Sequence, residues 1–521
     1  MSASADELML AIDCGTQSVR ALLIDLKGNI VAKRQQTLDG YVSAEDGWLE
    51  HDAEAFWQAS AAVSRRLSAE VPDLIARAKG VVVTAQRGSL TLVDDKGQPL
   101  RPFIIWLDQR RAHRTPPIPL WWRAAFMAAR VGGTIDHLAR ESELNWIAEH
   151  EPERLQRTHK VLLVSGWLNY RLTGRFADSV GSQVGYLPFD FKRHDWARGW
   201  DWKWRALAAT RDMMPDLVPV GSILGSLTRD AAEATGLPAG LPVVAGAADK
   251  ACEVLGAGAI SPEVGAISYG TTATINVTMS RYFEATPFIP PYPAALPGKF
   301  IAEVQIFRGF WMVNWLKEQF GHPEIAAAPL EGVSPEALFD RLVQNAPPGS
   351  DGLMLQPYWT PGVRTPGPEA RGAVIGFTDA HTRAHLFRAI LEGLAYALRE
   401  GSERIAARTR VPVTSLRVSG GGSQSAAAMQ ATADISNRPA ARPHTFETSG
   451  LGAAIVGAVG LGLHRDYAAA VGEMTRLGQT FEPDPAHGAL YEELYSRVYK
   501  RMYRRLAPLY EELHRTLRHG R

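Results

Sequence analysis

The order of apolar and polar positions near the start of the chain predicts a group of neighbouring strands. Residues 8–13 form an apolar run that ends in Asp13, and residues 19–37 alternate or run apolar around a turn at "DLKGN". Such runs, separated by Gly and Asn turns, are typical of a strand meander. The small-residue turn after Asp13 therefore joins strand to strand. Dinucleotide and P-loop glycine turns lead from a strand into a helix, so this pattern argues against both.

Helical spacing follows in the next segments. Residues 52–70 place Phe56, Trp57, Ala61 and Val63 on one face, and Asp52 is a candidate N-cap. Residues 79–100 return to strand patterns. Residues 120–175 are mainly helical and end in "WLNYRLTG", where Gly174 is a natural C-cap.

The second half of the chain repeats the opening order. Residues 239–259 predict a buried strand, a loop of small residues and a helix that begins near Asp249. Residues 263–279 then give strand, Gly-Thr-Thr and strand. A duplicated strand–turn–strand phosphate element resembles the organisation of actin-like ATPases. Chance recurrence is the alternative in a chain with 47 glycines.

The C-terminal patterns add more elements. Residues 381–405 predict an amphipathic helix, and residues 414–435 a strand, a triple glycine and a helix. From Leu490 onward, tyrosines recur at helical spacing, which favours a packing surface within the fold over an oligomer interface.

Bulk composition narrows the function classes. The 521 residues favour at least two domains, and the formal net charge of +1 gives no general attraction for nucleic acid or anionic membranes. The two cysteines, Cys14 and Cys252, suggest neither a disulfide framework nor a zinc site, and both are expected to be buried. The N-terminus lacks a signal-peptide pattern and no apolar run reaches membrane-spanning length, so we expect a cytoplasmic protein.

Several motifs occur in the same order as in one known family. They are "AIDCGTQSVRALLID", "ELNWIAEHEPERLQRTHKVLLVSGWLNYRLTG", "GAADKACEVLGAGA", "ISYGTTATI", "RGAVIGFTDAHTRAHLFRAILEGLAYALRE" and "VSGGGSQSAAAMQATADISNRPA". On these motifs the sequence resembles the FGGY carbohydrate kinases, which include xylulose, ribulose, gluconate and glycerol kinases. The resemblance spans nearly the whole chain.

The resemblance implies an α/β fold of two actin-like (ribonuclease H-like) domains, each with a mixed five-stranded sheet flanked by helices, and a catalytic cleft between them. We place the N-terminal domain, with the sugar site and the catalytic base, at residues 1–255. The C-terminal, ATP-binding domain is placed at residues 256–521, with its last helices packing back across the molecule.

Two carboxylates receive different roles. By resemblance Asp249 is the catalytic base for the acceptor hydroxyl, and a helix N-cap is the alternative. A carboxylate at Asp13 would repel phosphate held by the following turn unless a cation intervened, so Asp13 is the candidate ligand of Mg²⁺. A structural aspartate in a plain hairpin is the alternative for Asp13.

The resemblance also implies an ATP site made from three turns. The first two would hold phosphates through backbone and side-chain donors, and the third would let adenine or ribose lie against backbone. The expected ATP-binding residues are Gly15, Thr16, Gln17, Ser18, Gly270, Thr271, Thr272, Gly420, Gly421, Gly422, Gln424 and Ser425.

The sequence indicates less firmly which molecule accepts the phosphate. Candidate substrate contacts are Gln86, Arg87, Trp106, Asp108, Lys250 and Asp249. Glycerol kinases carry Arg-Glu after the glutamine and xylulose kinases typically Met-His, and Arg87-Gly88 matches neither pair completely. Lys250 stands where these kinases have Gln or Asn; it could act beside the base or extend to solvent. We expect a pentulose such as xylulose or ribulose, with glycerol, a hexulose or a sugar acid as alternatives.

Other interpretations stay open. A non-kinase actin-like ATPase would lack an acceptor site, and a catalytically silent sugar-binding regulator could share the fold. Arg308, between apolar residues, could reach the cleft or pair with Glu303. A homodimer is possible, and neither nucleic acid nor a membrane is expected as a partner.

Overall fold

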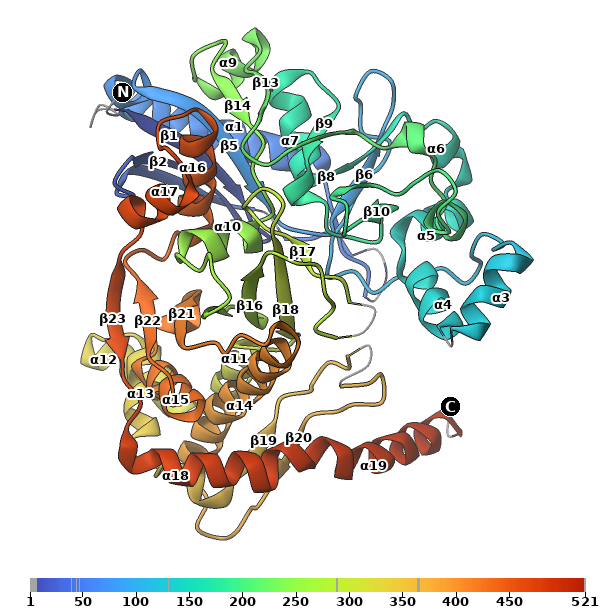
Figure 1. Cartoon of the computed structure of the whole chain (residues 1–521). Helices are drawn as coiled ribbons and strands as arrows, with labels where there is room; N and C mark the ends of the chain where they lie inside the picture. Colours follow the sequence, from blue (N-terminus) through green and yellow to red (C-terminus); the bar gives the residue numbers. More distant parts are fainter. Residues whose placement is uncertain are drawn as a thin grey trace.

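The chain folds into two lobes that meet along a central boundary (Figure 1). The computed structural model describes residues 7–519 apart from 39, 44, 46, 130, 287–288 and 363–365. Each lobe is built on a mixed sheet. This is the two-domain actin-like α/β architecture that the resemblance implied.

The first lobe contains a six-stranded sheet in the order β13-β14-β5-β1-β2-β3. Strand β1 pairs antiparallel with β2 and parallel with β5, and β14 adds to β5 in parallel. These strands are β1 (Leu8–Cys14), β2 (Ser18–Asp25), β3 (Ile30–Thr37), β5 (Ala78–Ala85), β13 (Ile223–Ser226) and β14 (Pro242–Val244). The N-terminal meander is therefore confirmed.

The second lobe repeats this order in a seven-stranded sheet, β17-β18-β16-β15-β21-β22-β23. Strand β15 pairs antiparallel with β16 and parallel with β21, just as β1 pairs with β2 and β5. The strands are β15 (Val264–Tyr269), β16 (Ala273–Met279), β17 (Tyr292–Pro293), β18 (Phe300–Ile306), β21 (Ser415–Ser419), β22 (Ala440–Pro443) and β23 (Leu477–Phe481). The matching topology excludes chance recurrence of the glycine turn.

The sheets are wider than the expected five strands. Five strands correspond in the two lobes, and the additional strands are β13 in the first and β17 and β23 in the second. All three pair antiparallel at or next to a sheet edge. Short edge strands need only one partner and leave little apolar pattern in the sequence, which is why they were not predicted.

Smaller sheets complete the fold. A four-stranded sheet joins β4 (Glu50–His51), β7 (Phe103–Ile104), β6 (Leu90–Val93) and β8 (Lys160–Leu163). Three two-stranded ribbons pair β9 (Ala177–Ser179) with β12 (Asp216–Val218), β10 (Phe189–Asp190) with β11 (Asp195–Trp196), and β19 (Met354–Gln356) with β20 (Ala373–Ile375).

Helices of the first half of the chain occur in the predicted segments, and three short helices, at residues 72–75, 203–206 and 229–235, were not predicted. They are α1 (Ala53–Glu70), α2 (Pro72–Ile75), α3 (Leu120–Ala128), α4 (Gly132–Glu141), α5 (Glu143–His150), α6 (Pro152–Gln156), α7 (Val164–Thr173), α8 (Lys203–Ala206), α9 (Arg229–Thr235) and α10 (Asp249–Gly256). Asp52 caps α1 by accepting a hydrogen bond from the Glu54 N–H, as expected. Gly174 ends α7 at φ +70°, a conformation that glycine adopts without strain.

Helices of the second half are α11 (Trp311–Phe320), α12 (His322–Glu331), α13 (Pro335–Val343), α14 (Arg383–Thr409), α15 (Ala426–Ser436), α16 (Thr448–Gly460), α17 (Tyr467–Met474), α18 (Pro485–Glu493) and α19 (Lys500–His519). Helix α16 lies beside α10 and against β1 and β5 of the first sheet (Figure 1). The glycines of α16 permit this contact, because a Cβ at Gly452 would stand 1.9 Å from the Cys252 carbonyl oxygen. The last part of the chain thus helps to fix α10, which carries Asp249.

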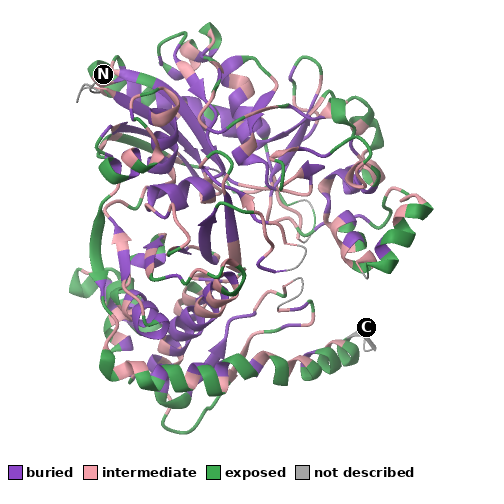
Figure 2. Cartoon of the chain, viewed as in Figure 1, coloured by how far each residue is buried: buried purple, intermediate pink, exposed green. Residues whose placement is uncertain are grey.

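Buried residues concentrate in the two sheets and the helices beside them, while the outer helices are largely exposed (Figure 2). Cys14 and Cys252 are both buried and free, as predicted. Tyr491, Tyr495 and Tyr499 are at most 1% exposed and belong to the core of the second lobe. The helical tyrosine pattern therefore reflects packing within the fold.

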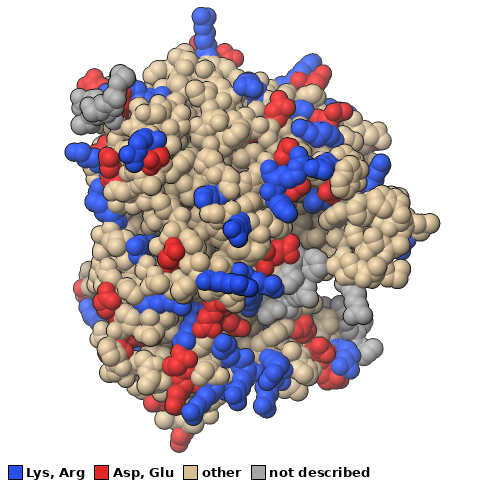
Figure 3. Space-filling model, viewed as in Figure 1, with Lys and Arg blue, Asp and Glu red and all other residues tan. Residues whose placement is uncertain are grey.

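The surface carries charges of both signs, interspersed over the face in Figure 3, in keeping with the small net charge. Within the described part of the chain, none of the helices is both long and apolar enough to cross a membrane.

Candidate active site

The site forms where three strands of the first sheet end. The Gln86 N–H donates to the Cys14 carbonyl at 3.0 Å, which ties the end of β5 to the end of β1. A single parallel bridge between Ala85 and Ala248 ties the same strand to the residue before Asp249. The ends of these strands therefore bring together Asp13, Gln86 and Asp249, although the three residues are far apart in sequence.

The turn between β1 and β2 forms a small polar cavity. The Gly15 N–H donates to the Ser18 carbonyl at 3.0 Å and closes the turn. A cavity of about 350 Å³ opens beside it, lined by Gly15, Thr16, Gln17, Ser18, Arg20, Gln35 and Thr37. Backbone and hydroxyl donors beside a guanidinium group suit an anionic ligand such as phosphate.

Asp13 is the next-to-last residue of β1 and is 4% exposed. Burial raises the pKa of Asp13 to about 7, the nearby Arg20 guanidinium opposes this rise, and the negative charge of Asp249 adds to it. Arg20 Nη1 lies 3.1 Å from Asp13 Oδ2, and Arg20 Nε lies 3.4 Å from a Glu447 carboxylate oxygen. A buried carboxylate facing other negative charges is a position that a cation would stabilise.

Asp249 is the first residue of α10, and the cap position before it is Ala248. Its carboxylate Oδ1 accepts a hydrogen bond from the Lys250 N–H at 2.7 Å. Burial raises the pKa of Asp249, while the positive charges of Arg87 and Lys250 lower it in part. A partly buried carboxylate whose pKa is raised has the properties of a general base.

Arg87 connects the two lobes. Its Nη2 lies 3.1 Å from Oε1 of Glu303 on β18, and its guanidinium stacks on the Tyr292 ring at 5.0 Å. Burial lowers the pKa of Arg87, but Glu303, Tyr292 and Asp249 together raise it above the usual arginine value. The Arg87 cation is therefore permanent and is balanced by a carboxylate from the opposite lobe.

Lys250 does not extend to solvent. Its Nζ lies 2.6 Å from Glu253 Oε2 and 2.5 Å from the Ser268 hydroxyl of β15. The other oxygen of Glu253 accepts a hydrogen bond from Ser419 of β21 at 2.6 Å. Lys250 and Glu253 thus join α10 to the second sheet, next to Asp249.

The second turn and the triple glycine lie together in the second lobe. The Gly270 N–H donates to the Thr272 carbonyl at 2.9 Å, closing a turn like that of the first lobe. Gly420 adopts φ +82°, and a Cβ there would stand 2.6 Å from the Tyr269 carbonyl oxygen. The triple glycine is therefore packed against the end of β15, while Gly421 has open space in front of it.

Residues after the triple glycine are held by nearby side chains. The Ser425 hydroxyl caps α15 and donates to Asp340 Oδ1 at 2.5 Å. The Arg442 guanidinium donates to the Gln424 carbonyl at 3.0 Å, and the Gln424 residue itself is exposed. Gln424 is therefore accessible to a ligand, whereas the Ser425 hydroxyl has a structural partner.

The aromatic candidate Trp106 lies beside the first turn. Its indole N–H donates to the Thr16 hydroxyl at 3.1 Å, and that hydroxyl lies 3.4 Å from Gln86 Oε1. Gln86 is 3% exposed, and its Nε2 has no hydrogen-bond partner among the described residues. The Gln86 amide is therefore an unpaired buried donor beside Asp249, and it can donate a hydrogen bond to a hydroxyl group of a bound ligand.

Two other candidates have structural partners. Asp108 accepts hydrogen bonds from the Leu49 N–H at 2.6 Å and the Arg110 guanidinium at 2.7 and 2.8 Å, and its side chain is 3% exposed. Arg308 donates to the Thr360 hydroxyl at 3.3 Å and stacks on Trp311 at 4.9 Å. The pairing of Arg308 with Glu303, one of the two alternatives for Arg308, is not found, because Glu303 is paired with Arg87.

No cluster of three or more metal-binding side chains occurs in the residues that the structure describes. A magnesium ion that travels with a nucleotide does not need such a cluster, because phosphate oxygens and water supply most of its ligands. Asp13, a buried carboxylate within the electrostatic influence of Asp249, fits such an ion.

Sequence reasoning missed Arg20, Glu253 and Tyr292, and it considered Glu303 only as a partner of Arg308. Each of these residues contributes a charge or a ring, and none lies in a turn of small residues. Only Arg20 could have been predicted from the sequence as a site residue, because it is a cation on the strand that directly follows the first glycine turn.

Each lobe thus contains a glycine turn between two strands, and a buried carboxylate and a cation that joins the lobes accompany the first turn. The family models for the FGGY family of carbohydrate kinases match this chain at residues 8–256 (N-terminal domain) and 265–461 (C-terminal domain). The chain therefore belongs to the FGGY family of carbohydrate kinases. It is a phosphotransferase that uses ATP and an alcohol acceptor.

Individual relatives agree with this assignment. The chain is 30% identical to a xylulose kinase of Staphylococcus epidermidis, over 94% of this chain and 95% of the relative. It is 29% identical to a glycerol kinase of Dechloromonas aromatica, over 93% and 95% of the two chains. The crystal structure of xylulose kinase from Rhodospirillum rubrum superposes with a TM-score of 0.81 at 28% identity, over 97% of this chain and all of that chain.

Proposed function

We propose that this kinase transfers the γ-phosphate of ATP to a hydroxyl of a ketose, with Asp249 as general base and Mg²⁺ at Asp13. Asp249 carries the proposal: it is partly buried, its pKa is raised, and it lies beside two cations and an unpaired amide donor. A group with these properties can accept the proton of a bound hydroxyl as the hydroxyl attacks phosphorus.

Each lobe contributes a different part of the reaction. The turns at Gly15–Ser18 and Gly270–Thr272 would hold the phosphates from opposite sides, with Arg20 adding positive charge. The open face of Gly421, with the exposed Gln424 nearby, would receive the nucleoside. Magnesium, when bound, would neutralise charge on the phosphates beside Asp13.

The acceptor would lie between Gln86, Trp106 and Asp249. The Gln86 amide would donate to a hydroxyl, the indole face would cover C–H groups, and Arg87 would orient a second oxygen. Asp108 is assigned the role of holding the loop of Trp106 through Leu49 and Arg110, without contact to the acceptor.

A pentulose such as xylulose or ribulose is the favoured acceptor, because xylulose kinases recur among both the relatives and the solved structures. Glycerol is the second candidate, since glycerol kinases are similar to nearly the same extent. The Gly88 after Arg87 lacks the carboxylate that glycerol kinases carry there, which favours the ketose.

A panel of pentuloses, hexuloses, sugar acids and glycerol tests this proposal by acceptor-stimulated ADP release. We expect the highest kcat/KM for a pentulose. ATP hydrolysis that no acceptor stimulates would contradict the proposed phosphoryl transfer and would favour an actin-like ATPase.

A further inference from the structure

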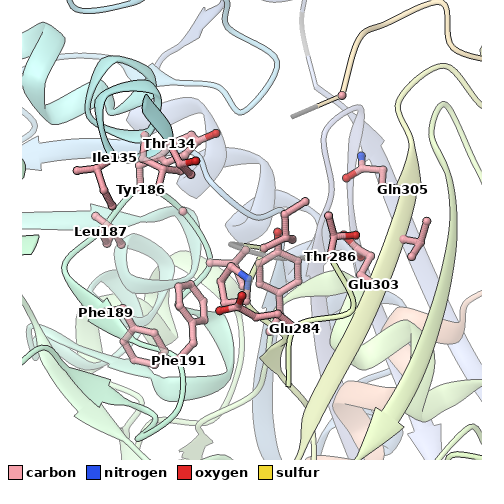
Figure 4. Close-up of a pocket in the computed structure, with 18 of the residues that line it drawn as sticks. Thr134, Ile135, Tyr186, Leu187, Phe189, Phe191, Glu284, Thr286, Glu303 and Gln305 are labelled. Atoms are coloured by element: carbon pink, nitrogen blue, oxygen red, sulfur yellow. The ribbon is translucent and has the colours of Figure 1, made fainter. Parts of the chain in front are cut away.

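A second, larger cavity lies between the lobes next to the acceptor site. Its volume is about 530 Å³, within the range that holds drug-sized ligands. Figure 4 shows its two facing walls, with Ile135, Tyr186, Leu187 and Phe191 on one side and Glu303 and Gln305 on the other. A plain pentulose or glycerol has too few atoms to fill this volume as well as contact Asp249.

The first wall is mainly apolar and comes from α4 and the segment around β10. Phe191 packs edge-on against Tyr292 of the other lobe, with ring centroids 6.0 Å apart. Tyr186, Leu138 and Phe191 are only partly buried, so their apolar atoms remain accessible from the cavity. Partly exposed aromatic groups that converge on one cavity favour an aromatic ligand.

The second wall connects this cavity to the reaction site. Tyr292 and Glu303 line the cavity, and both contact Arg87, whose charge acts on Asp249. Glu303 Oε1 is paired with Arg87, whereas Oε2 is buried and has no hydrogen-bond partner in the described part of the chain. The Glu303 side chain is 5% exposed. A buried, unpaired carboxylate oxygen at a cavity wall is a position that a ligand hydroxyl would satisfy.

Two pairs of polar side chains in the cavity have partners within it. The Tyr282 hydroxyl donates to Glu284 at 3.1 Å, and Arg404 donates to the Thr286 hydroxyl at 3.3 Å. These groups offer less to a polar ligand than Glu303 does. The unpaired Glu303 oxygen therefore gives the end of the cavity that adjoins Arg87 a polar group that is open to a ligand.

We propose that this cavity receives an aromatic substituent of the acceptor, whose hydroxylated part lies between Glu303 and Asp249. The preferred acceptor is then an aryl-substituted polyol or ketose. This inference rests on the proposed kinase function and narrows its substrate class.

Glycerol phenyl ether and glycerol methyl ether form a matched pair of probes. Their Kd values would be measured by calorimetry on the full chain without nucleotide, for the wild type, Phe191→Ala and Leu330→Ala. Leu330 is 88% exposed and does not line the cavity, so its variant is the control. We expect the phenyl ether to bind at least about tenfold tighter than the methyl ether, as a hydrophobic pocket discriminates by about that factor or more.

Phe191→Ala should abolish most of this preference, and Leu330→Ala should retain it. Equal affinity for the two ethers, no binding of either, or an unchanged preference in Phe191→Ala would overturn the inference. The kinase function is judged separately by acceptor-stimulated ADP release with unsubstituted sugars. A positive result there with no phenyl preference would refute only the aromatic site.

Discussion

Lys250 stabilises the junction between the lobes by neutralising a buried carboxylate. Lys250 and Glu253 are 20% and 11% exposed, and the pair is joined to Ser268 and Ser419 of the second sheet. Replacing Lys250 by Met keeps the length of the side chain and leaves Glu253 without its counter-charge. Removing one partner of a buried pair typically costs about 3–5 kcal/mol. We expect about 3 kcal/mol here, since Lys250 is partly solvated and two serine hydroxyls still donate to Glu253.

The effect should depend on pH. Burial would raise the pKa of Glu253, but Lys250 and the hydroxyl donors lower it below the ordinary value of 4.5. In the wild type this group therefore adds stability above pH 4.5, which is lost as the pH falls through its folded pKa. In Lys250→Met the pKa of Glu253 should rise instead, so the deficit should be largest at neutral pH and shrink as Glu253 becomes protonated.

Guanidinium unfolding followed by tryptophan fluorescence, between neutral and acid pH, measures this change. The double variant Lys250→Met/Glu253→Gln should recover most of the stability, because glutamine needs no counter-charge. Lys317→Met is the matched control, since its partner Glu336 is 64% exposed and such a pair contributes about 1 kcal/mol or less. A loss below about 1 kcal/mol in Lys250→Met, or an equal loss in the double variant, would refute the reasoning.

Further predictions concern catalysis and the nucleotide site. In Asp13→Ala, Mg²⁺-dependent turnover should fall far more than sugar affinity measured by calorimetry; an equal loss of both would contradict a metal role. The value of kcat/KM should rise with pH as Asp249 loses its proton, with a midpoint above the ordinary aspartate pKa of 3.8. Arg87→Met should move that midpoint upward, because it removes a positive charge that lowers the pKa of Asp249. An unchanged midpoint in Arg87→Met would contradict this prediction. Gly422→Ala should weaken ADP binding by displacing the Phe310 ring, which a Cβ would approach to 2.5 Å, and unchanged ADP affinity would contradict this placement.

Local patterns predicted the elements that carry the site. Apolar periodicity and turn chemistry predicted the strand–turn–strand order around Gly15 and its repetition around Gly270, and the structure contains both hairpins. The family match at residues 8–256 and 265–461 agrees with the order of the motifs. The position of Asp249 at the start of a helix was likewise visible in the loop of small residues before it.

Contacts between distant segments could not be predicted in the same way. Glu303 was considered as a partner for the nearby Arg308, but it pairs with Arg87 from the other lobe. Asp108 was expected to contact sugar, yet its oxygens accept hydrogen bonds from Leu49 and Arg110. Which buried charges become partners depends on how the sheets and loops pack, and one chain's local pattern does not contain that information.

The most direct test of the account is phosphoryl transfer by Asp249→Asn. The substitution keeps the size of the side chain and removes its ability to accept the hydroxyl proton. Formation of the sugar phosphate from ATP and the best pentulose should fall about 10²–10⁴-fold, the usual contribution of a general base, while ADP binds with unchanged affinity. Turnover near the wild-type rate, with ADP still bound normally, would show that Asp249 is not the base.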